Sequence, residues 1–223
     1  MPKAFSERER QGIRERLITA GKRLINTMGL RRLIVDDAAR EAGISKGSFY
    51  SFFPSREDFI LSVFESWEAE YRGALIRQIT EGAGTPRERV ERFFLGALEI
   101  LEREPGLARI TMREIEAIIQ GLAPERMRAH QAVDNRVLEE AFTRWAGDGL
   151  LVPGLANAFR GLVPALFSIA MHREDFPPGS YQPAVKLIAE ALAMRIAGGK
   201  HDKRHNNAGP VQKLRPRQRR RGR

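Results

Sequence analysis

The sequence predicts an all-α protein with a small N-terminal three-helix domain, a C-terminal helical bundle and about nine helices in total. Three observations predict this class. Apolar residues recur at helical spacing along most of the chain, whereas no long stretch alternates at the period of two that is typical of strands. Short segments that contain Gly or Pro separate the periodic stretches. Several of these stretches also open with a residue type that commonly caps a helix.

The first helix is expected to begin after Ser6, which forms a capping-box pattern with Glu9. In such a box the serine hydroxyl accepts a hydrogen bond from the Glu9 amide, and the carboxylate reaches back to the serine. Gly29 is expected to end the helix, because glycine commonly follows the last helical turn. The apolar residues at helical spacing between these two points are Ile13, Leu17, Leu24, Ile25 and Met28.

A second long helix is expected after Ser55, with Asp58 in its first turn, where the helix dipole favours a negative charge. Pro86 after Thr85 predicts another helix start, because proline fits the first helical position. The apolar stripe of the helix after Ser55 consists of Ile60, Val63, Phe64, Trp67 and Tyr71. Further helices are predicted at residues 107–120, 124–146, 155–172 and 182–197.

Composition excludes several classes of protein. The chain has 223 residues and no cysteine, so it has no disulfide framework and no cysteine-based metal or catalytic site. It shows no glycine-rich phosphate loop, HExxH pattern or nucleophile elbow, so we expect no enzyme activity, metal or cofactor. Its apolar runs are too short to cross a bilayer, and its N-terminus lacks the apolar core of a signal peptide. A cytoplasmic protein with no membrane partner is therefore expected.

The formal net charge of +10 is unevenly distributed. Residues 1–58 carry +4, residues 59–199 carry −3 and residues 200–223 carry +9. The last segment combines clustered arginines with very few apolar residues, a composition that predicts a disordered tail. Such a tail could add a salt-sensitive attraction to phosphate that does not depend on sequence.

The stretch from Val35 to Phe53 fits two very short helices joined at Gly43. Gly43 can adopt the left-handed conformation that ends the first helix, and Ser45 can cap the second. This is the sequence form of a helix-turn-helix. Small residues lie where the two helices would cross closely: Ala38, Ala39 and Ala42.

The second of these helices has an unusual exposed side. Its Gly47 would weaken a helix by about 1 kcal/mol relative to alanine, a cost that is understandable if the backbone must approach another surface closely. Phe49, Phe52 and Phe53 supply the anchoring side. A recognition helix that enters the major groove of DNA needs a small, hydrogen-bonding face of this kind. The residues of the exposed side are Lys46, Gly47, Ser48, Tyr50 and Ser51.

Residues Ala42 to Phe59 (AGISKGSFYSFFPSREDF) resemble the signature of TetR-family transcriptional regulators, and the similarity covers about residues 8–60. The resemblance implies a helix-turn-helix DNA-binding domain over residues 1–54 and a helical ligand-binding and dimerisation domain over residues 55–199. The basic tail, residues 200–223, follows. Ile34 departs from the family, which commonly has a threonine there that caps the helix and touches phosphate.

The resemblance also implies a role for individual residues. Lys46, Gly47 and Ser48 fall where the family's recognition helix meets base edges, and Tyr50 falls where a tyrosine contacts phosphate. Arg56 occupies the position of a phosphate-binding lysine, and arginine keeps the charge while adding bidentate geometry. The full set of expected DNA-binding residues is Ser45, Lys46, Gly47, Ser48, Tyr50, Ser51 and Arg56.

The family dimerises through its last two helices and binds a small molecule inside the C-terminal bundle. The expected dimer interface comprises Leu162, Leu166, Leu187, Ile188, Ala191 and Leu192. The expected pocket comprises Phe94, Leu98, Met112, Ile115, Glu116, Ile119, Phe142, Trp145, Phe159, Val163, Phe167 and Met171. Further polar contacts are expected from Arg109, Arg113, His130 and His172. Most of the apolar residues would also suit the core of any helical domain.

The expected partners are double-stranded DNA with a palindromic operator, a second copy of the chain and a small-molecule effector. We expect a sequence-specific repressor that a lipophilic or aromatic ligand releases from its operator. The alternative is a DNA-binding protein that acts through a protein partner or DNA architecture, without a small ligand. An enclosed apolar cavity in the bundle would favour the first hypothesis, and a filled core would favour the second.

Overall fold

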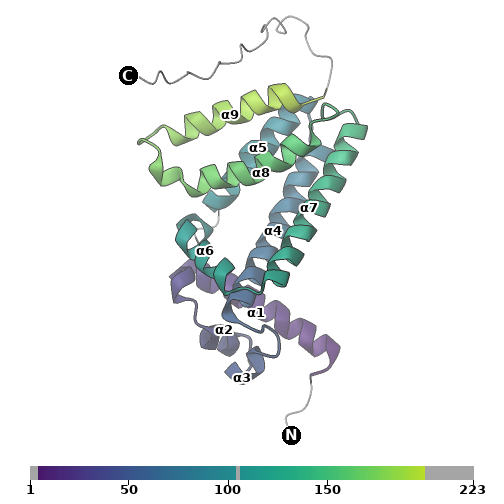
Figure 1. The fold of residues 1–223 in the computed structure, drawn as a ribbon. Helices are drawn as coiled ribbons and strands as arrows, with labels where there is room; N and C mark the ends of the chain where they lie inside the picture. The colour runs from purple at the N-terminus through teal and green to yellow at the C-terminus, as the bar shows by residue number, and fades with distance from the viewer. Residues whose placement is uncertain (1–4, 104–105, 199–223) are drawn as a thin grey trace, which may run out of the picture.

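The computed structural model describes residues 5–103 and 106–198 and confirms the all-α prediction for them (Figure 1). The predicted tail, residues 200–223, lies outside the described residues. No helix in the described part is long and apolar enough to span a bilayer. The α-helices are α1 (Glu7–Met28), α2 (Val35–Glu41), α3 (Lys46–Phe49), α4 (Arg56–Glu81), α5 (Pro86–Arg103), α6 (Met112–Gly121), α7 (Pro124–Gly147), α8 (Ala156–Met171) and α9 (Tyr181–Ile196). Short 3₁₀ helices are η1 (Leu30–Arg32), η2 (Leu107–Arg109) and η3 (Arg173–Asp175).

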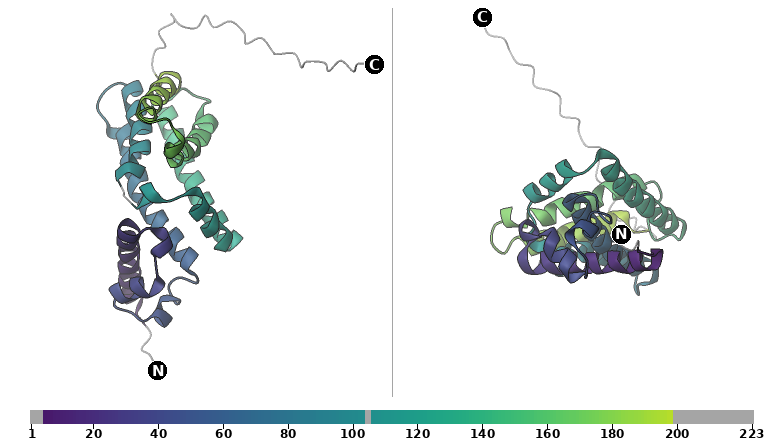
Figure 2. Two further views of the ribbon diagram at one scale, coloured as in Figure 1. Left: turned by 90° about the vertical axis from the view of Figure 1, so that its left-hand side faces the viewer. Right: turned by 90° about the horizontal axis from the view of Figure 1, so that it is seen from below.

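The helices form an elongated molecule with α3 near one end and α9 at the other (Figures 1 and 2). Helices α1, α2 and α3 pack together at the N-terminal end. The long helix α4 leaves this group and runs beside α5 and α7. At the far end, α8 and α9 pack on α5. A change in the position of α4 would therefore alter the packing in both halves of the molecule.

Side-chain caps begin several of the helices, among them α1, α3, α4 and α6. The Ser6 capping box is confirmed, with Ser6 N donating to Glu9 Oε2 at 2.8 Å. The single helix predicted over residues 107–120 is wrong, because η2 and α6 occupy this stretch as separate elements. Thr111 forms a second capping box with Glu114 and satisfies the free amides of a new helix start. Apolar periodicity continues across this break and does not reveal it.

The core of the N-terminal half extends beyond the first 54 residues. It includes the first turns of α4, from Phe59 to Trp67, and three residues around α6: Ile110, Ile118 and Leu122. Helix α6 therefore packs on α4 beside the N-terminal helices, and the C-terminal region supplies part of the apolar core on which the helix-turn-helix rests.

A second core fills the far half of the molecule, between α4, α5, α7, α8 and α9. Its centre is a group of interlocked rings, in which the Phe142 and Phe159 centroids lie 4.2 Å apart. Phe94 and Trp145 complete this group, and all four side chains are almost fully buried. The indole N–H of Trp145 donates to Thr80 Oγ1 at 3.1 Å. Buried indole groups usually find such a partner.

Candidate nucleic-acid interface

The turn between α2 and α3 has the geometry that the sequence predicts. Gly43 has φ of +75°, a left-handed conformation that most residues adopt only with strain. The amide of Ile44 donates to the Ala39 carbonyl at 3.0 Å, which closes the turn. Three alanines of this unit are almost fully buried, so small side chains do lie at the close crossing: Ala38, Ala39 and Ala42.

Helix α3 is anchored by one side chain. Phe49 is fully buried, and its ring lies 5.6 Å from that of Phe53 and 5.2 Å from that of Phe59. The Phe59 ring meets it edge to face, a favourable geometry for aromatic pairs. Because Phe49 points inward, Lys46 and Tyr50 are left exposed on the other side of this short helix, and 47% of Tyr50 is accessible.

The polar side chains in and around α3 already have partners within the helix-turn-helix. The Ser45 side chain caps the helix by accepting from the Ser48 amide at 3.1 Å. Lys46 Nζ lies 3.1 Å from the carboxylate of Asp36 on α2. Ser51 Oγ donates to the Ser48 carbonyl at 2.7 Å. Gly47 faces open space, so its backbone can be approached closely. The exposed side of residues Ser45 to Ser51 thus forms a preorganised polar ridge.

Two residues near this ridge have particular surroundings. The guanidinium of Arg56 donates to the carbonyls of Leu30 at 2.8 Å and Leu33 at 3.1 Å, so it ties the start of α4 to the loop before α2. Ile34 precedes α2 without capping it, and 55% of the residue is exposed beside the ridge. The structure therefore gives Arg56 an internal structural contact in addition to its predicted place near phosphate.

Two arginines that the sequence analysis overlooked support the ridge from behind. Arg10 donates to the Ser51 carbonyl at 2.9 Å. Arg14 donates to the Phe52 carbonyl at 3.3 Å, and its guanidinium lies 4.5 Å from the centre of the Phe53 ring. Their spacing of four residues places them on one side of α1, which is the signal that could have identified them.

The predicted pocket residues do not form one group. Five are buried together in the second core: Phe94, Leu98, Phe142, Trp145 and Phe159. Met112, Ile115 and Met171 are partly buried. Glu116, Ile119 and Phe167 are exposed, and the side chain of Val163 is outside the described residues. Among the polar residues, Arg109 donates to the Asn26 carbonyl, Arg113 is exposed, and His172 donates to the Ser168 carbonyl.

Two hollows among the described residues lie outside the bundle. One lies between the N-terminal half of α1 and the turn at Gly43, and the other lies between α1 and α4. Both are open to solvent. In the second core the aromatic rings pack against one another, with the centroids of Phe142 and Phe159 4.2 Å apart. A ligand that binds between these rings would require them to move.

The predicted interface residues divide between core and surface. Leu166 is buried, and Leu162, Ile188 and Leu192 are partly buried against the second core. Ala191 is exposed, and Leu187 is 67% exposed. Two more large apolar side chains of α8 and α9 are also exposed, Phe167 at 48% and Met194 at 56%. The two helices thus combine a side that faces the core with an apolar outer side.

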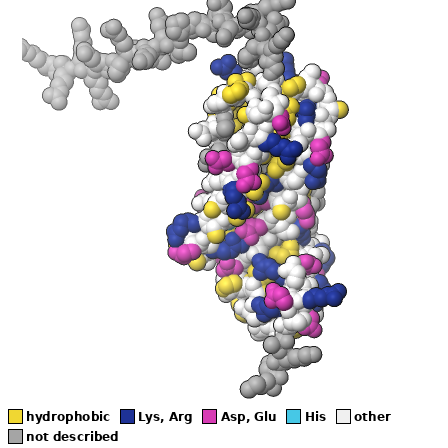
Figure 3. Space-filling model, turned by 90° about the vertical axis from the view of Figure 1, so that its right-hand side faces the viewer, with side chains coloured by type: hydrophobic (Ala, Val, Ile, Leu, Met, Phe, Trp, Pro, Cys, Tyr) yellow, Lys and Arg dark blue, Asp and Glu magenta, His cyan; other side chains and the backbone are white. Residues whose placement is uncertain are grey.

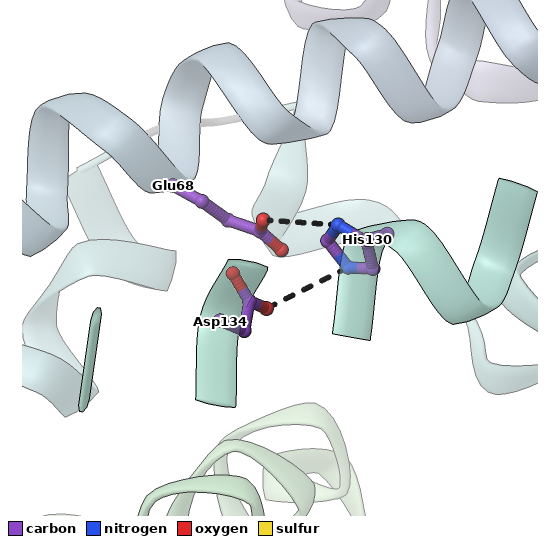
Figure 4. A group of neighbouring side chains, drawn as sticks. All are labelled: Glu68, His130 and Asp134. Atoms are coloured by element: carbon purple, nitrogen blue, oxygen red, sulfur yellow. Dashed lines mark ion pairs between the residues drawn. The ribbon is translucent and has the colours of Figure 1, made fainter. Parts of the chain in front are cut away.

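An ion-pair cluster joins α4 to α7 midway along the molecule (Figure 4). His130 lies between two carboxylates, with Nδ1 3.9 Å from Glu68 Oε2 and Nε2 3.7 Å from Asp134 Oδ2. Arg72 lies 2.5 Å from Asp134. One nitrogen or oxygen atom from each of Glu68, His130 and Asp134 lies within 4.8 Å of the others. Each ring nitrogen faces a different carboxylate, and a guanidinium already pairs with Asp134, which is the geometry of an ion-pair cluster.

The turn at Gly43 and the exposed polar face of α3 place the N-terminal helices in the class of helix-turn-helix proteins. Residues 17–63 match the family described as bacterial regulatory proteins, tetR family. The chain is 30% identical over 81 residues to the HTH-type transcriptional repressor NemR of Escherichia coli, which covers 36% of this chain and 41% of NemR. It is 39% identical over 49 residues to the regulator EthR of Mycolicibacterium smegmatis, covering 22% and 23% of the two chains. These alignments span less than half of the relatives.

Solved structures extend the similarity in fold along most of the chain. The reduced form of E. coli NemR superposes with a TM-score of 0.61 at 18% identity, over 84% of this chain and 98% of NemR. A TetR-family regulator from Pectobacterium atrosepticum gives 0.60 at 20% identity, over 84% and 93%. The sequence match to the tetR family thus covers residues 17–63, the solved structures share the fold, and the relatives named here are transcriptional regulators rather than enzymes.

Proposed function

We propose that the chain is a dimeric, sequence-specific repressor of transcription that inserts α3 into the major groove of DNA. The observation that carries this proposal is the polar ridge of α3, held outward by the buried ring of Phe49. The major groove distinguishes all four base pairs, and a lysine there pairs well with guanine. Lys46 and the open backbone at Gly47 are suited to base edges, and the hydroxyl of Tyr50 is suited to phosphate.

The exposed apolar residues of α8 and α9 support dimerisation. Phe167, Leu187 and Met194 present large apolar surface at the end of the molecule away from α3. Contiguous apolar surface of this kind commonly marks an interface. A twofold dimer through these helices would carry two α3 helices, which read half-sites about 34–36 Å apart when they occupy one face of DNA. The operator is accordingly palindromic.

We further propose that a small lipophilic or aromatic ligand releases the repressor. The support is compositional, since the bundle holds a large aromatic cluster that can stack on such a ligand. The close packing of these rings favours the alternative, in which a protein partner or DNA architecture takes the place of a ligand. A ligand shifts the equilibrium only if it binds the two states with different affinity. DNA affinity that stays constant across a broad panel of lipophilic and aromatic compounds would favour the partner.

The proposal of sequence-specific binding is tested by selecting bound duplexes from a random pool with the purified protein. The expected product is an inverted repeat bound at least about a thousandfold more tightly than random duplex. Replacing Lys46 with Ala should relax the preference at one position of each half-site. If the protein, with or without residues 200–223, prefers no duplex over random competitor, the proposal is wrong.

A further inference from the structure

The ion-pair cluster between α4 and α7 contains seven ionisable side chains. Helix α4 contributes Asp58, Glu65, Glu68 and Arg72, and α7 contributes Arg126, His130 and Asp134. Acidic and basic side chains are interspersed over the side of the molecule that Figure 3 shows, in keeping with this pairing. His130 is the least exposed member of the cluster, with 11% of its side chain accessible. It has carboxylates on both sides of its ring.

The geometry favours a protonated His130. Nδ1 lies 3.4 Å from Glu65 Oε1, and Nε2 lies 3.7 Å from Asp134 Oδ2, so acceptors face both ring nitrogens. A neutral imidazole has only one N–H and would leave one of these carboxylates without a donor, whereas the imidazolium has two. The hydrogen bond to Glu65 accordingly raises the pKa of His130 above its usual value.

Glu68 is the second group in the cluster that can hold a proton. Its Oε2 atom is buried and accepts no hydrogen bond from the described residues. Burial, together with the like charge of Asp134, raises the pKa of Glu68 to about 7. Glu65 behaves in the opposite way: burial opposes its ionisation, but hydrogen bonds from His130 and Arg126 outweigh burial and lower its pKa to about 2.

The cluster is connected to the helix-turn-helix by two arginines and a buried serine. Arg126 of α7 contacts Glu65 at 2.5 Å, Asp58 in the first turn of α4 at 3.4 Å, and Ser62 Oγ at 3.3 Å. The same Ser62 hydroxyl accepts from Arg14 of α1 at 3.4 Å. Arg14 in turn donates to the Phe52 carbonyl, three residues beyond the end of α3. A chain of polar contacts therefore runs from His130 to the segment that follows the recognition helix.

We propose that this cluster is a proton-binding site that controls DNA affinity: protons held at His130 and at Glu68 keep α7 attached to α4 and the helix-turn-helix, and their release weakens this attachment. The inference rests on the proposed function, because its output is DNA binding. After proton release, Glu65 and Glu68 on α4 and Asp134 on α7 surround a neutral ring, with Arg72 and Arg126 as the remaining cations. Repulsion between the carboxylates then loosens α7, and α4 and Arg14 are less well positioned.

The sign of the pH dependence follows from these groups. His130 and Glu68 both bind protons more tightly in the folded protein than in the unfolded chain, so their contribution to stability is lost as the pH rises. For Glu68 the loss runs from about pH 4.5 to about 7, and for His130 it runs from 6.5 upward to its raised pKa. DNA affinity should therefore fall between pH 6 and pH 8, by about fivefold, a typical size for coupling between sites.

Histidine resonances test the site without DNA. The His130 imidazole is assigned in NMR spectra of the full chain by comparison with His130→Gln and is titrated from pH 5 to 9. We expect it to titrate above the ordinary value of about 6.5 and to shift downward in Glu65→Gln. A His130 that titrates at or below 6.5 in the unchanged protein overturns the proposal, whatever the DNA measurements show.

DNA affinity is then measured at pH 6 and pH 8, at constant ionic strength, on a duplex selected as above. The unchanged protein and His172→Gln should lose affinity in parallel, because His172 is an exposed histidine outside the cluster. His130→Gln should bind equally at both pH values, and Glu68→Gln, which cannot ionise, should show a reduced loss. A flat or rising profile in the unchanged protein, or a loss that His130→Gln retains, overturns the proposal. Absence of any preferred duplex at either pH would instead contradict the proposed function.

Discussion

At the scale of single residues, two glycines of the helix-turn-helix have opposite roles. Gly43 is required by backbone geometry, since its φ of +75° is strained for other residues. Gly47 lies within α3, and a methyl group there would meet nothing closer than Ser45 Oγ at 3.9 Å. Nothing among the described residues requires glycine at position 47, and the close approach of DNA to α3 proposed above would account for it.

Replacing Gly47 with Ala should therefore stabilise the protein and weaken its binding to DNA. The expected gain is about 0.5–1 kcal/mol in the free energy of unfolding, because alanine is the better helix former. The added methyl group should reduce affinity for the selected duplex by about tenfold or more. Urea unfolding and fluorescence anisotropy measure the two effects. Gly43→Ala is the matched control and should lose about 1–2 kcal/mol of stability. Unchanged DNA affinity in Gly47→Ala would contradict a close approach of DNA.

Phe49 is expected to contribute to stability, and Lys46 is expected to contribute to DNA binding. Phe49→Ala should cost about 3–5 kcal/mol of stability, because it removes a fully buried ring from the first core. Lys46→Ala should change stability by less than about 0.5 kcal/mol, since its ion pair with Asp36 is exposed. The same change should weaken DNA binding. Thermal unfolding and anisotropy together check the separation, and comparable destabilisation by both substitutions would be inconsistent with it.

At the scale of elements, the close packing of α1 on α4 depends on Gly21. A Cβ atom at this position would lie 2.5 Å from Val63 Cγ2 and 2.8 Å from Phe59 Cζ. Both partners belong to the buried core and cannot move away without disturbing it. The helix-turn-helix is thus joined to α4 by direct contact between α1 and the side chains of α4.

Gly21→Ala should accordingly cost about 1–3 kcal/mol in the free energy of unfolding, through overpacking between α1 and α4. Gly12→Ala is a suitable control on the same helix, because its added methyl group meets only the end of the Arg16 side chain, at 3.8 Å. That control should be neutral or slightly stabilising. Chemical unfolding of both variants checks the prediction, and equal stability of the two would mean that α1 and α4 can separate without cost.

At the scale of the whole molecule, the two ends have distinct surfaces. The polar ridge of α3 lies at one end, and exposed apolar side chains of α8 and α9 lie at the other (Figure 1). Helix α4 spans the distance between them and contributes to both apolar cores. The dimerisation proposed at one end and the DNA binding proposed at the other could therefore be coupled through a single helix.

Leu187→Glu should convert the dimer to a monomer, because it places a charge on the most exposed large apolar residue of α9. Sedimentation measures the mass, and anisotropy with full and half operators should show lost affinity for the full site only. Val133→Glu provides the control, since Val133 of α7 is 46% exposed and lies outside the predicted interface. A Leu187→Glu variant that remains dimeric would exclude this part of α9 from the interface.

The sequence by itself determined the all-α class, most helix boundaries and the helix-turn-helix. These features depend on interactions within a few residues, such as the Ser6 capping box, the turn at Gly43 and the inward position of Phe49. Local geometry and the spacing of apolar residues depend on nearby residues in the chain, so both can be inferred from the sequence.

Only the tertiary structure decided which distant residues meet. Arg126, His130 and Asp134 follow one another at intervals of four on α7, but their partners on α4 are about 60 residues away in sequence. The expected pocket residues have suitable side chains at suitable helical spacing, yet some are packed in the core and others are exposed. Helical spacing fixes the side of a helix on which a residue lies, whereas the packing of whole helices decides what that side contacts.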